Sequence, residues 1–176
     1  MIIEVINSLK NLARTGWMIR GIPPHLAENV AAHSFSSALI TLYLCEKLVK
    51  QGVKVDCYRA TVLSLIHDIP EAFTGDIITP IIDRYLGDVR KDIELDVIKK
   101  MESVLIKKLY NEFLEQKTIE ARIAKLSDYV STYVQCLLYE KIGYDVSDIK
   151  QNMLKKITEL SRQLGIHDPL KLLQIT

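Results

Sequence analysis

Apolar residues recur every three or four positions along most of the chain, which is the spacing of side chains on one face of an α-helix. The stretches at 2–13, 28–50, 93–107, 119–134 and 154–164 all show this period. In the first two stretches the recurring residues are Ile2, Ile6, Leu9 and Ala13, and then Phe35, Leu39 and Leu42. We predict one helix in each of the five stretches.

Two further stretches differ from this pattern. Residues 56–69 are apolar almost all round, as expected of a central buried helix. Near the C-terminus, Asp168 precedes Pro169, and this pair suits the N-cap and first position of a short last helix.

The fold class follows from what accompanies these helical periods. No run alternates β-branched and polar residues, and no Asn-Gly or Asp-Gly hairpin signal is present. A length of 176 residues suits one domain with a sizeable core. We therefore predict an all-α fold, a single domain of about six to seven helices over residues 1–176, with the C-terminal helices at 147–174.

Composition and charge exclude several classes of protein. Hydrophobic residues make up 48% and charged residues 26%, which is typical of globular chains. The formal net charge is +1, so nothing indicates a nucleic acid held by bulk electrostatics. The longest uncharged stretch, 29–45, is too short and polar to span a membrane, and no signal peptide is recognisable. Cys45, Cys57 and Cys136 form no CxxC motif, and we interpret them as reduced thiols of a cytoplasmic protein.

The candidate chemistry starts at the dipeptide His67-Asp68, which follows a strongly apolar segment. Burying an imidazole beside a carboxylate is costly unless both have partners. Pro70 disfavours helical geometry at the residue before it, so we expect the pair at the end of its helix, where both side chains can turn toward one point. His167-Asp168 has the same two residues, but there the Asp suits a helix cap.

Two distant residues complete a possible ligand set. Asp128 lies off the main apolar stripe of its helix, in line with small residues at 121, 124 and 131, and His33 lies in a small polar patch. With His67 and Asp68 they form a mixed nitrogen and oxygen set that suits one divalent transition metal, such as Mn, Co, Fe, Ni or Zn. The alternative is that each is satisfied locally, His33 in a cap network and Asp128 in an ion pair with Lys125.

Four sequence strings are similar to the motifs of one family. HDIPEAFTGDI stands at 67–77, preceded by RTGW at 14–17 and ENVAAHS at 28–34, and followed by KLSD at 125–128. These strings resemble those of the HD-domain phosphohydrolases, and more narrowly the 5′-deoxynucleotidase branch. The resemblance covers residues 9–140 or thereabouts.

The resemblance implies an all-helical fold with a single divalent metal bound by His33, His67, Asp68 and Asp128. It also implies that Glu71 and Asp76 serve catalysis beside that metal. The implied activity is hydrolysis of deoxyribonucleoside 5′-monophosphates to nucleoside and phosphate, commonly by a homodimer. One departure is Ala32, since members carry an acid directly before the first His. If that carboxylate orients the imidazole, its loss weakens the metal site.

Further roles rest on side-chain chemistry. Glu71 lies one helical turn past the HD pair, within reach of the attacking water or the leaving oxygen as a general acid or base. A planar guanidinium binds two phosphate oxygens, and either Arg14 or Arg20 could supply it. Trp17 is predicted either to stack on the sugar and base or to lie in the core. Lys125 either reaches phosphate or pairs with a nearby acid, and Asp76 either orients Glu71 or binds a sugar hydroxyl.

Two other functions stay open at this point. The first is an HD hydrolase of another phosphate ester, such as a nucleoside triphosphate or a pyrophosphorylated nucleotide, since no residue reads a base edge unambiguously. The second is a non-catalytic helical binding module that keeps a metal for stability. Only His25 and His167 remain outside the motifs, which favours one metal over two.

Overall fold

The computed structural model of the chain describes residues 1–78, 82–87 and 89–175. Apart from one isolated bridge between Ala13 and Asn29, the regular elements of these residues are all helical. They are α1 (Ile2–Asn11), α2 (Thr15–Ile19), α3 (Val30–Lys50), α4 (Cys57–Ile66), α5 (Glu71–Thr74), η1 (Ile82–Leu86, a π-helix), α7 (Val89–Lys99), α8 (Val104–Glu115), α9 (Ile119–Lys141), α10 (Ser147–Leu164) and α11 (Pro169–Leu172). The predicted all-α fold is confirmed. Among the described residues no helix combines the length and apolar character needed to cross a bilayer.

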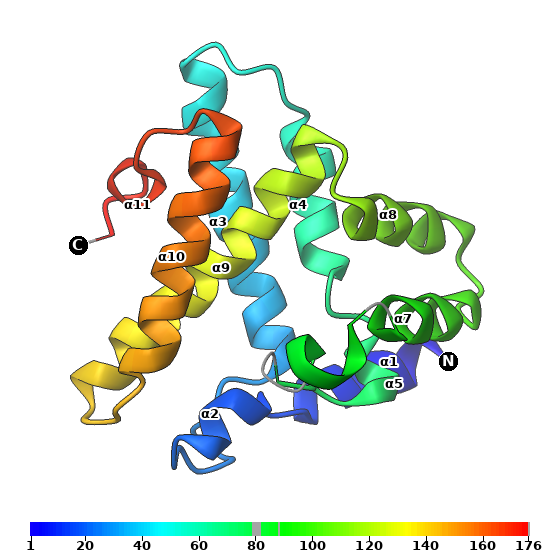
Figure 1. Cartoon of the computed structure of the whole chain (residues 1–176). Coiled ribbons are helices and arrows are strands. Elements are labelled where there is room, and N and C mark those ends of the chain that lie inside the picture. Colours follow the sequence, from blue (N-terminus) through cyan, green and yellow to red (C-terminus); the bar gives the residue numbers. More distant parts are fainter. Residues whose placement is uncertain (79–81, 88, 176) are drawn as a thin grey trace.

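The long helix α9 is the centre of the arrangement, because it packs against α3, α4, α8 and α10 (Figure 1). Its side toward α3 and α4 carries the small buried residues Ala121, Ala124 and Ser131. Small side chains at a helix contact allow the axes to approach closely. Asp128 shares this side of the helix, so the close packing surrounds its carboxylate with neighbouring helices.

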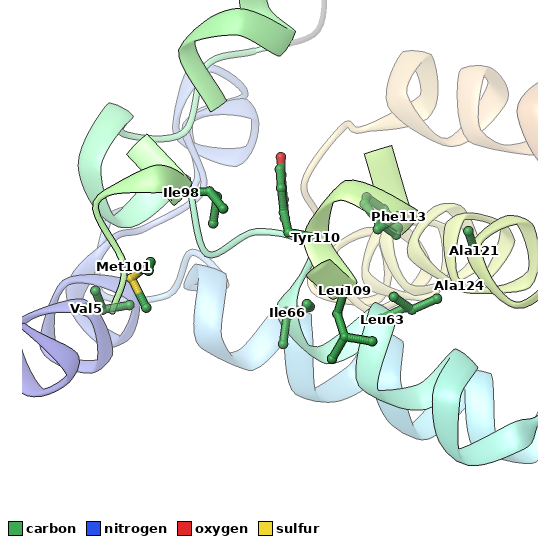
Figure 2. Close-up of a cluster of buried hydrophobic side chains, with 10 residues drawn as sticks. All are labelled: Val5, Leu63, Ile66, Ile98, Met101, Leu109, Tyr110, Phe113, Ala121 and Ala124. Atoms are coloured by element: carbon green, nitrogen blue, oxygen red, sulfur yellow. The ribbon is translucent and has the colours of Figure 1, made fainter. Parts of the chain in front are cut away.

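Three clusters of buried side chains hold this arrangement together. One joins α1, α4, α7, α8 and α9 and contains Val5, Leu63, Ile66, Ile98, Met101, Leu109, Tyr110, Phe113, Ala121 and Ala124 (Figure 2). A second joins α3, α4, α9 and α10, with Leu44, Leu48, Ile123, Leu126, Val130 and Ile157 among its members. A third surrounds Trp17 and Tyr139. The helices α3, α4 and α9 are therefore fixed from several directions by apolar packing.

The apolar period predicts the positions of helices α1 and α3 correctly. Most of the apolar residues that define this period, however, lie on the exposed face of each helix and not on the buried one. Phe35 and Leu39 are more than half exposed, and so are Ile2 and Ile6. The inner face of α3 instead carries several polar residues, namely His33, Ser34, Ser37 and Thr41. In α4, similarly, Tyr58 and Leu65 are exposed, so this helix is not buried all round as predicted. The interior of the fold is partly polar because it holds the candidate site.

The single helix predicted over 93–107 is wrong, because the structure has two helices there. α7 ends at Lys99, and α8 begins after Ser103, whose hydroxyl accepts a hydrogen bond from the amide of Ile106 at 3.2 Å. A serine that satisfies a free amide in this way favours a new helix start over continuation. The predicted cap of the last helix is confirmed, since Asp168 accepts from the amide of Lys171 at 3.0 Å.

The core packing yields a prediction about stability. Leu63 in α4 is fully buried in the cluster of Figure 2, whereas Leu105 in α8 is 64% exposed. We expect Leu63→Ala to lower the free energy of unfolding by about 3 kcal/mol, through lost burial and the cavity left behind. The matched Leu105→Ala should change it by less than about 0.5 kcal/mol. Urea unfolding followed by circular dichroism measures both, and equal losses would contradict this assignment of the core.

Candidate metal centre and active site

The His67-Asp68 pair lies at the C-terminal end of α4, as the following Pro70 predicts. The helix ends at Ile66, and His67 is its C-cap residue. The Nδ1 atom of His67 lies 2.6 Å from the carbonyl oxygen of Ser64. This contact fixes the ring proton on Nδ1 and leaves the Nε2 lone pair free to bind a metal. The Nε2 atom is buried and has no hydrogen-bond partner among the described residues, as expected of a ligand atom.

Two helices bring the other candidate ligands to the same point. His33, in the first turns of α3, is fully buried, and its Nε2 lies 3.0 Å from Oδ1 of Asp128 in α9 and 3.8 Å from Oδ2 of Asp68. The Nε2 atom of His67 lies 3.1 Å from the same oxygen of Asp68 and 3.7 Å from that of Asp128. All four side chains that the sequence singles out therefore converge.

These spacings fit a coordination shell. Metal–ligand bonds of about 2.1 Å hold neighbouring ligand atoms about 3.0 Å apart in octahedral geometry and about 3.4 Å apart in tetrahedral geometry. The four nitrogen–oxygen distances, 3.0, 3.1, 3.7 and 3.8 Å, lie close to that range. The ligand atoms of His33, His67 and Asp68 also lie within 4.8 Å of one another. The residues present fit one divalent cation.

The charges of the centre favour a cation at its middle. Burial by itself lowers the pKa of His67, but Asp68 and Asp128 stabilise the imidazolium and raise the pKa to about 10. Burial likewise raises the pKa of Asp68, yet the charge on His67 lowers it to about 2. Both carboxyl groups thus stay ionised and need a positive charge between them, which a divalent ion supplies when the imidazoles are neutral.

Asp128 has a separate partner for each oxygen. Oδ1 faces the two imidazoles, while Oδ2 accepts a hydrogen bond from Nζ of Lys125 at 2.8 Å. The ion pair considered as an alternative to metal binding is therefore present, and it leaves the ligand oxygen in place. The nearby cation Lys125 also keeps the pKa of Asp128 well below its usual range, against the effect of burial.

Ala32 offers the His33 ring no carboxylate, and other groups contact the ring. Its Nδ1 faces the hydroxyl of Ser131 at 3.4 Å and Oε2 of Glu28 at 3.8 Å. The guanidinium of Arg14 lies 3.2 Å from the same nitrogen. Groups from α9 and from the segments before α3 thus surround the Nδ1 edge of the ring.

Glu71 lies one turn past the pair, in the wall of the cavity. Its Oε2 atom is buried with no hydrogen-bond partner among the described residues. Burial and the nearby charges of Asp68 and Asp76 raise its pKa well above the usual value. Glu71 is therefore suited to hold a proton at neutral pH and to donate it.

Asp76 is held by Thr15, the first residue of α2. Its Oδ2 accepts a hydrogen bond from the amide of Thr15 at 2.5 Å, and its carbonyl accepts one from the Thr15 hydroxyl at 2.8 Å. The start of α2 thus fixes this carboxylate. Thr15 belongs to the RTGW string, but sequence reasoning gave it no role, because the contact joins segments 61 residues apart.

The two arginines lie in different surroundings. Arg14 lies beside the ligand cluster, with Nη1 donating to Oε2 of Glu28 at 3.2 Å and to Oγ1 of Thr132 at 3.3 Å. Arg20 forms a two-pronged ion pair with Asp148 at the exposed rim. Of the two, Arg14 is the one beside the candidate ligands.

Trp17 borders the cavity but is almost entirely buried. Its ring packs edge-on against Tyr139 with 5.1 Å between centroids, and its Nε1 donates to Oε2 of Glu28 at 3.3 Å. This packing favours the core role that the sequence left open. Glu28 therefore joins Arg14 and Trp17, and the only sign of it in the sequence is its position in the ENVAAHS string.

A cavity of about 390 Å³ opens over the centre, within the range typical of small-molecule sites. Its walls come from α2, the segment around α5, α7, α9 and α10. Cationic side chains surround it, namely Arg14, Arg20, Arg90, Lys125 and Lys156. Arg90 is a cavity residue that the sequence motifs did not indicate. Its Nε donates a hydrogen bond to Oε1 of Glu94 at 2.5 Å, and the hydroxyl of Tyr110 donates one to the other oxygen of Glu94 at 2.8 Å.

Comparison with known proteins gives one family. The model of the HD-domain family matches residues 6–165. A 5′-deoxynucleotidase HDDC2 from Dictyostelium discoideum is 29% identical over 147 residues, covering 78% of this chain and 75% of that protein. The 5′-deoxynucleotidase YGK1 from Saccharomyces cerevisiae is 29% identical over 160 residues, covering 85% and 70%.

Solved structures agree on the fold. The PH0347 protein from Pyrococcus horikoshii matches with a TM-score of 0.84 and 29% identity over the full length of both chains. A conserved hypothetical protein from Pyrococcus furiosus matches with a TM-score of 0.81 and 28% identity, covering 98% of this chain and 97% of that one.

The centre yields a prediction about metal binding. We expect each chain to bind one divalent ion and to unfold at a higher temperature when the ion is bound. At a free ion concentration one hundred times Kd, binding should raise the free energy of unfolding by about 2.7 kcal/mol. His67→Ala should lose the ion and the thermal shift. His167→Ala, in the other His-Asp dipeptide, is the matched control because its ring is exposed and should behave as wild type. Elemental analysis and thermal melts with Mn²⁺ and a chelator measure this, and a bound ion in His67→Ala would contradict the site.

Proposed function

The chain belongs to the HD-domain family, and from that membership and the geometry of its site we propose that it is a metal-dependent phosphohydrolase of deoxyribonucleoside 5′-monophosphates. The observation that carries the proposal is the convergence of His33, His67, Asp68 and Asp128 on one point, with the buried carboxyl of Glu71 in the wall of the adjoining cavity. The names of the relatives support the substrate class.

The four converging side chains are the proposed ligands of one divalent transition metal. When bound, such an ion lowers the pKa of its water to about 7 and polarises a phosphoryl oxygen. Two imidazoles and two carboxylates favour Mn, Co, Fe, Ni or Zn over the harder Mg and Ca ions. Three cysteines without disulfides agree with a reducing, cytoplasmic setting. The organisation of residues 1–176 as one domain stays a prediction.

The remaining residues have proposed roles at the phosphate. Arg14 binds and orients the phosphate oxygens, because its guanidinium lines the cavity beside the ligands. Lys125 adds a second positive charge there while holding Asp128. Glu71 gives its proton to the leaving 5′ oxygen of the nucleoside, which is the step that a raised pKa favours. Asp76, anchored by Thr15, has its Oδ1 atom available for a sugar hydroxyl.

The alternatives receive less support. The named relatives are 5′-deoxynucleotidases, which favours a monophosphate substrate over a triphosphate. A non-catalytic module would give no reason for a buried, unpartnered carboxyl at Glu71.

A homodimer is the proposed assembly. The adjacent helices α3 and α4 expose apolar side chains at helical spacing, namely Phe35, Leu39, Leu42 and Tyr43, with Tyr58, Val62 and Leu65. Exposed apolar side chains on two adjacent helices are typical of an interaction surface, and a second copy of the chain can cover them with the same residues.

The activity is tested by phosphate release from deoxy- and ribonucleoside monophosphates. We expect the protein with Mn²⁺ or Co²⁺ to hydrolyse at least one deoxynucleotide, a chelator to abolish this, and Asp68→Ala to be inactive. Glu71→Gln should lower kcat by about 10²- to 10⁴-fold while the metal stays bound, since only proton transfer is lost. Full turnover by Asp68→Ala would exclude the site, and a preference for triphosphates would favour the alternative hydrolase.

The dimer is tested by light scattering after size-exclusion chromatography. Phe35→Glu places a charge in the centre of the apolar face, and we expect it to convert the dimer to monomer. Val104→Glu, at an exposed apolar position of α8, is the matched control and should leave the mass unchanged. A dimer that survives Phe35→Glu would exclude this face.

A further inference from the structure

The cavity extends beyond the metal centre along the groove between α9 and α10. The pocket-facing residues of α10 are Asp148, Ile149, Asn152, Met153 and Lys156, which follow one stripe of the helix. None of them belongs to a motif that the sequence singled out. Their contacts with residues of α9 show the order in which they lie along the groove.

The helices α9 and α10 run antiparallel (Figure 1), so each residue of α10 can be placed along the groove by the α9 residues that it contacts. Nζ of Lys156 lies 5.4 Å from the ring centroid of Tyr129, directly after that ligand. At the other end Ile149 packs with the cluster that contains Cys136, eight residues past Asp128. Eight helical residues span about 12 Å. Lys156 therefore lies near the end of the cavity that holds the candidate metal ligands, and Ile149 lies at the far end.

The far end has an apolar lining that the protein itself does not cover. Ile19, the last residue of α2, is 54% exposed although it lines the cavity. Ile149 and Met153 line the cavity from α10. Ile149 is half-buried and Met153 is buried, so Ile19 offers the most accessible apolar surface of the three. An apolar lining of this kind suits a flat, largely apolar group.

An ion pair fixes the two sides of this end. Arg20 follows Ile19, and Asp148 precedes Ile149; the two charged side chains meet in a two-pronged contact with Nε to Oδ1 at 3.1 Å. Such a pair is geometrically specific. It therefore sets the separation between α2 and α10 where the isoleucines lie, and it accounts for Arg20 without a phosphate contact.

We propose that this slot between the end of α2 and α10 is the nucleobase subsite, with Ile19, Ile149 and Met153 contacting the base and Asn152 bonding its edge. The inference rests on the proposed function, because a phosphomonoester at the metal centre directs the rest of the nucleotide along the groove. The side-chain amide of Asn152 makes no hydrogen bond to other described residues, and it offers both a donor and an acceptor. Arg20 and Asp148 act as positioning residues.

The test separates the two halves of the substrate. Calorimetry on the Mn²⁺-loaded protein measures the Kd of inorganic phosphate and, separately, of deoxyadenosine, deoxyguanosine, deoxycytidine and thymidine. Ile19→Ala should weaken nucleoside binding roughly tenfold, since apolar contact with the base is lost. Asn152→Leu should change the ranking of the four nucleosides. Both variants should bind phosphate as wild type does.

Leu154→Ala, on α10 but outside the cavity lining, is the matched control and should change neither Kd. Wild-type affinity of both variants for all four nucleosides would overturn the subsite, and so would a wild type that binds phosphate but no nucleoside. Either result leaves phosphate release from nucleotides intact. Absence of that release, in contrast, would count against the proposed function itself.

Discussion

Two imidazoles and two carboxylates share one buried volume between α3, α4 and α9, and their charges must balance there because buried ions have lost their hydration. The fold meets this constraint with several cations. Lys125 holds one oxygen of Asp128, Arg14 lies against the ring of His33, and the centre between the ligands fits a divalent ion. The apolar clusters that join these helices keep them together despite the cost of polar groups inside.

Much of the architecture was predictable from the sequence because local signals dominate it. The helical periods indicate the long helices, Pro70 sets the end of α4 beside the HD pair, and Asp168 caps the last helix. The alignment of Asp128 with small residues also indicated close packing on that side of α9. For these features the residue type and its nearest neighbours along the chain suffice.

The rest depends on contacts between distant segments, which periodicity does not report. Phe35 and Leu39 have the spacing of a core stripe, yet much of the buried face of α3 carries His33 and its polar neighbours. The elements α2 and α5 are too short to show a period. The role of Thr15 becomes visible only through its contact with Asp76, 61 residues along the chain, and that of the pocket-facing side of α10 only through the cavity that it lines.

The long pairing of α9 with α10 has a consequence for how such proteins diversify. Candidate ligands come from α3, α4 and α9, whereas the lining at the far end of the cavity comes from α2 and α10. Residues such as Asn152 contribute nothing to the buried charge balance. Substitutions on α10 can therefore change which nucleoside is recognised, while the residues of the hydrolytic site on the other helices stay the same.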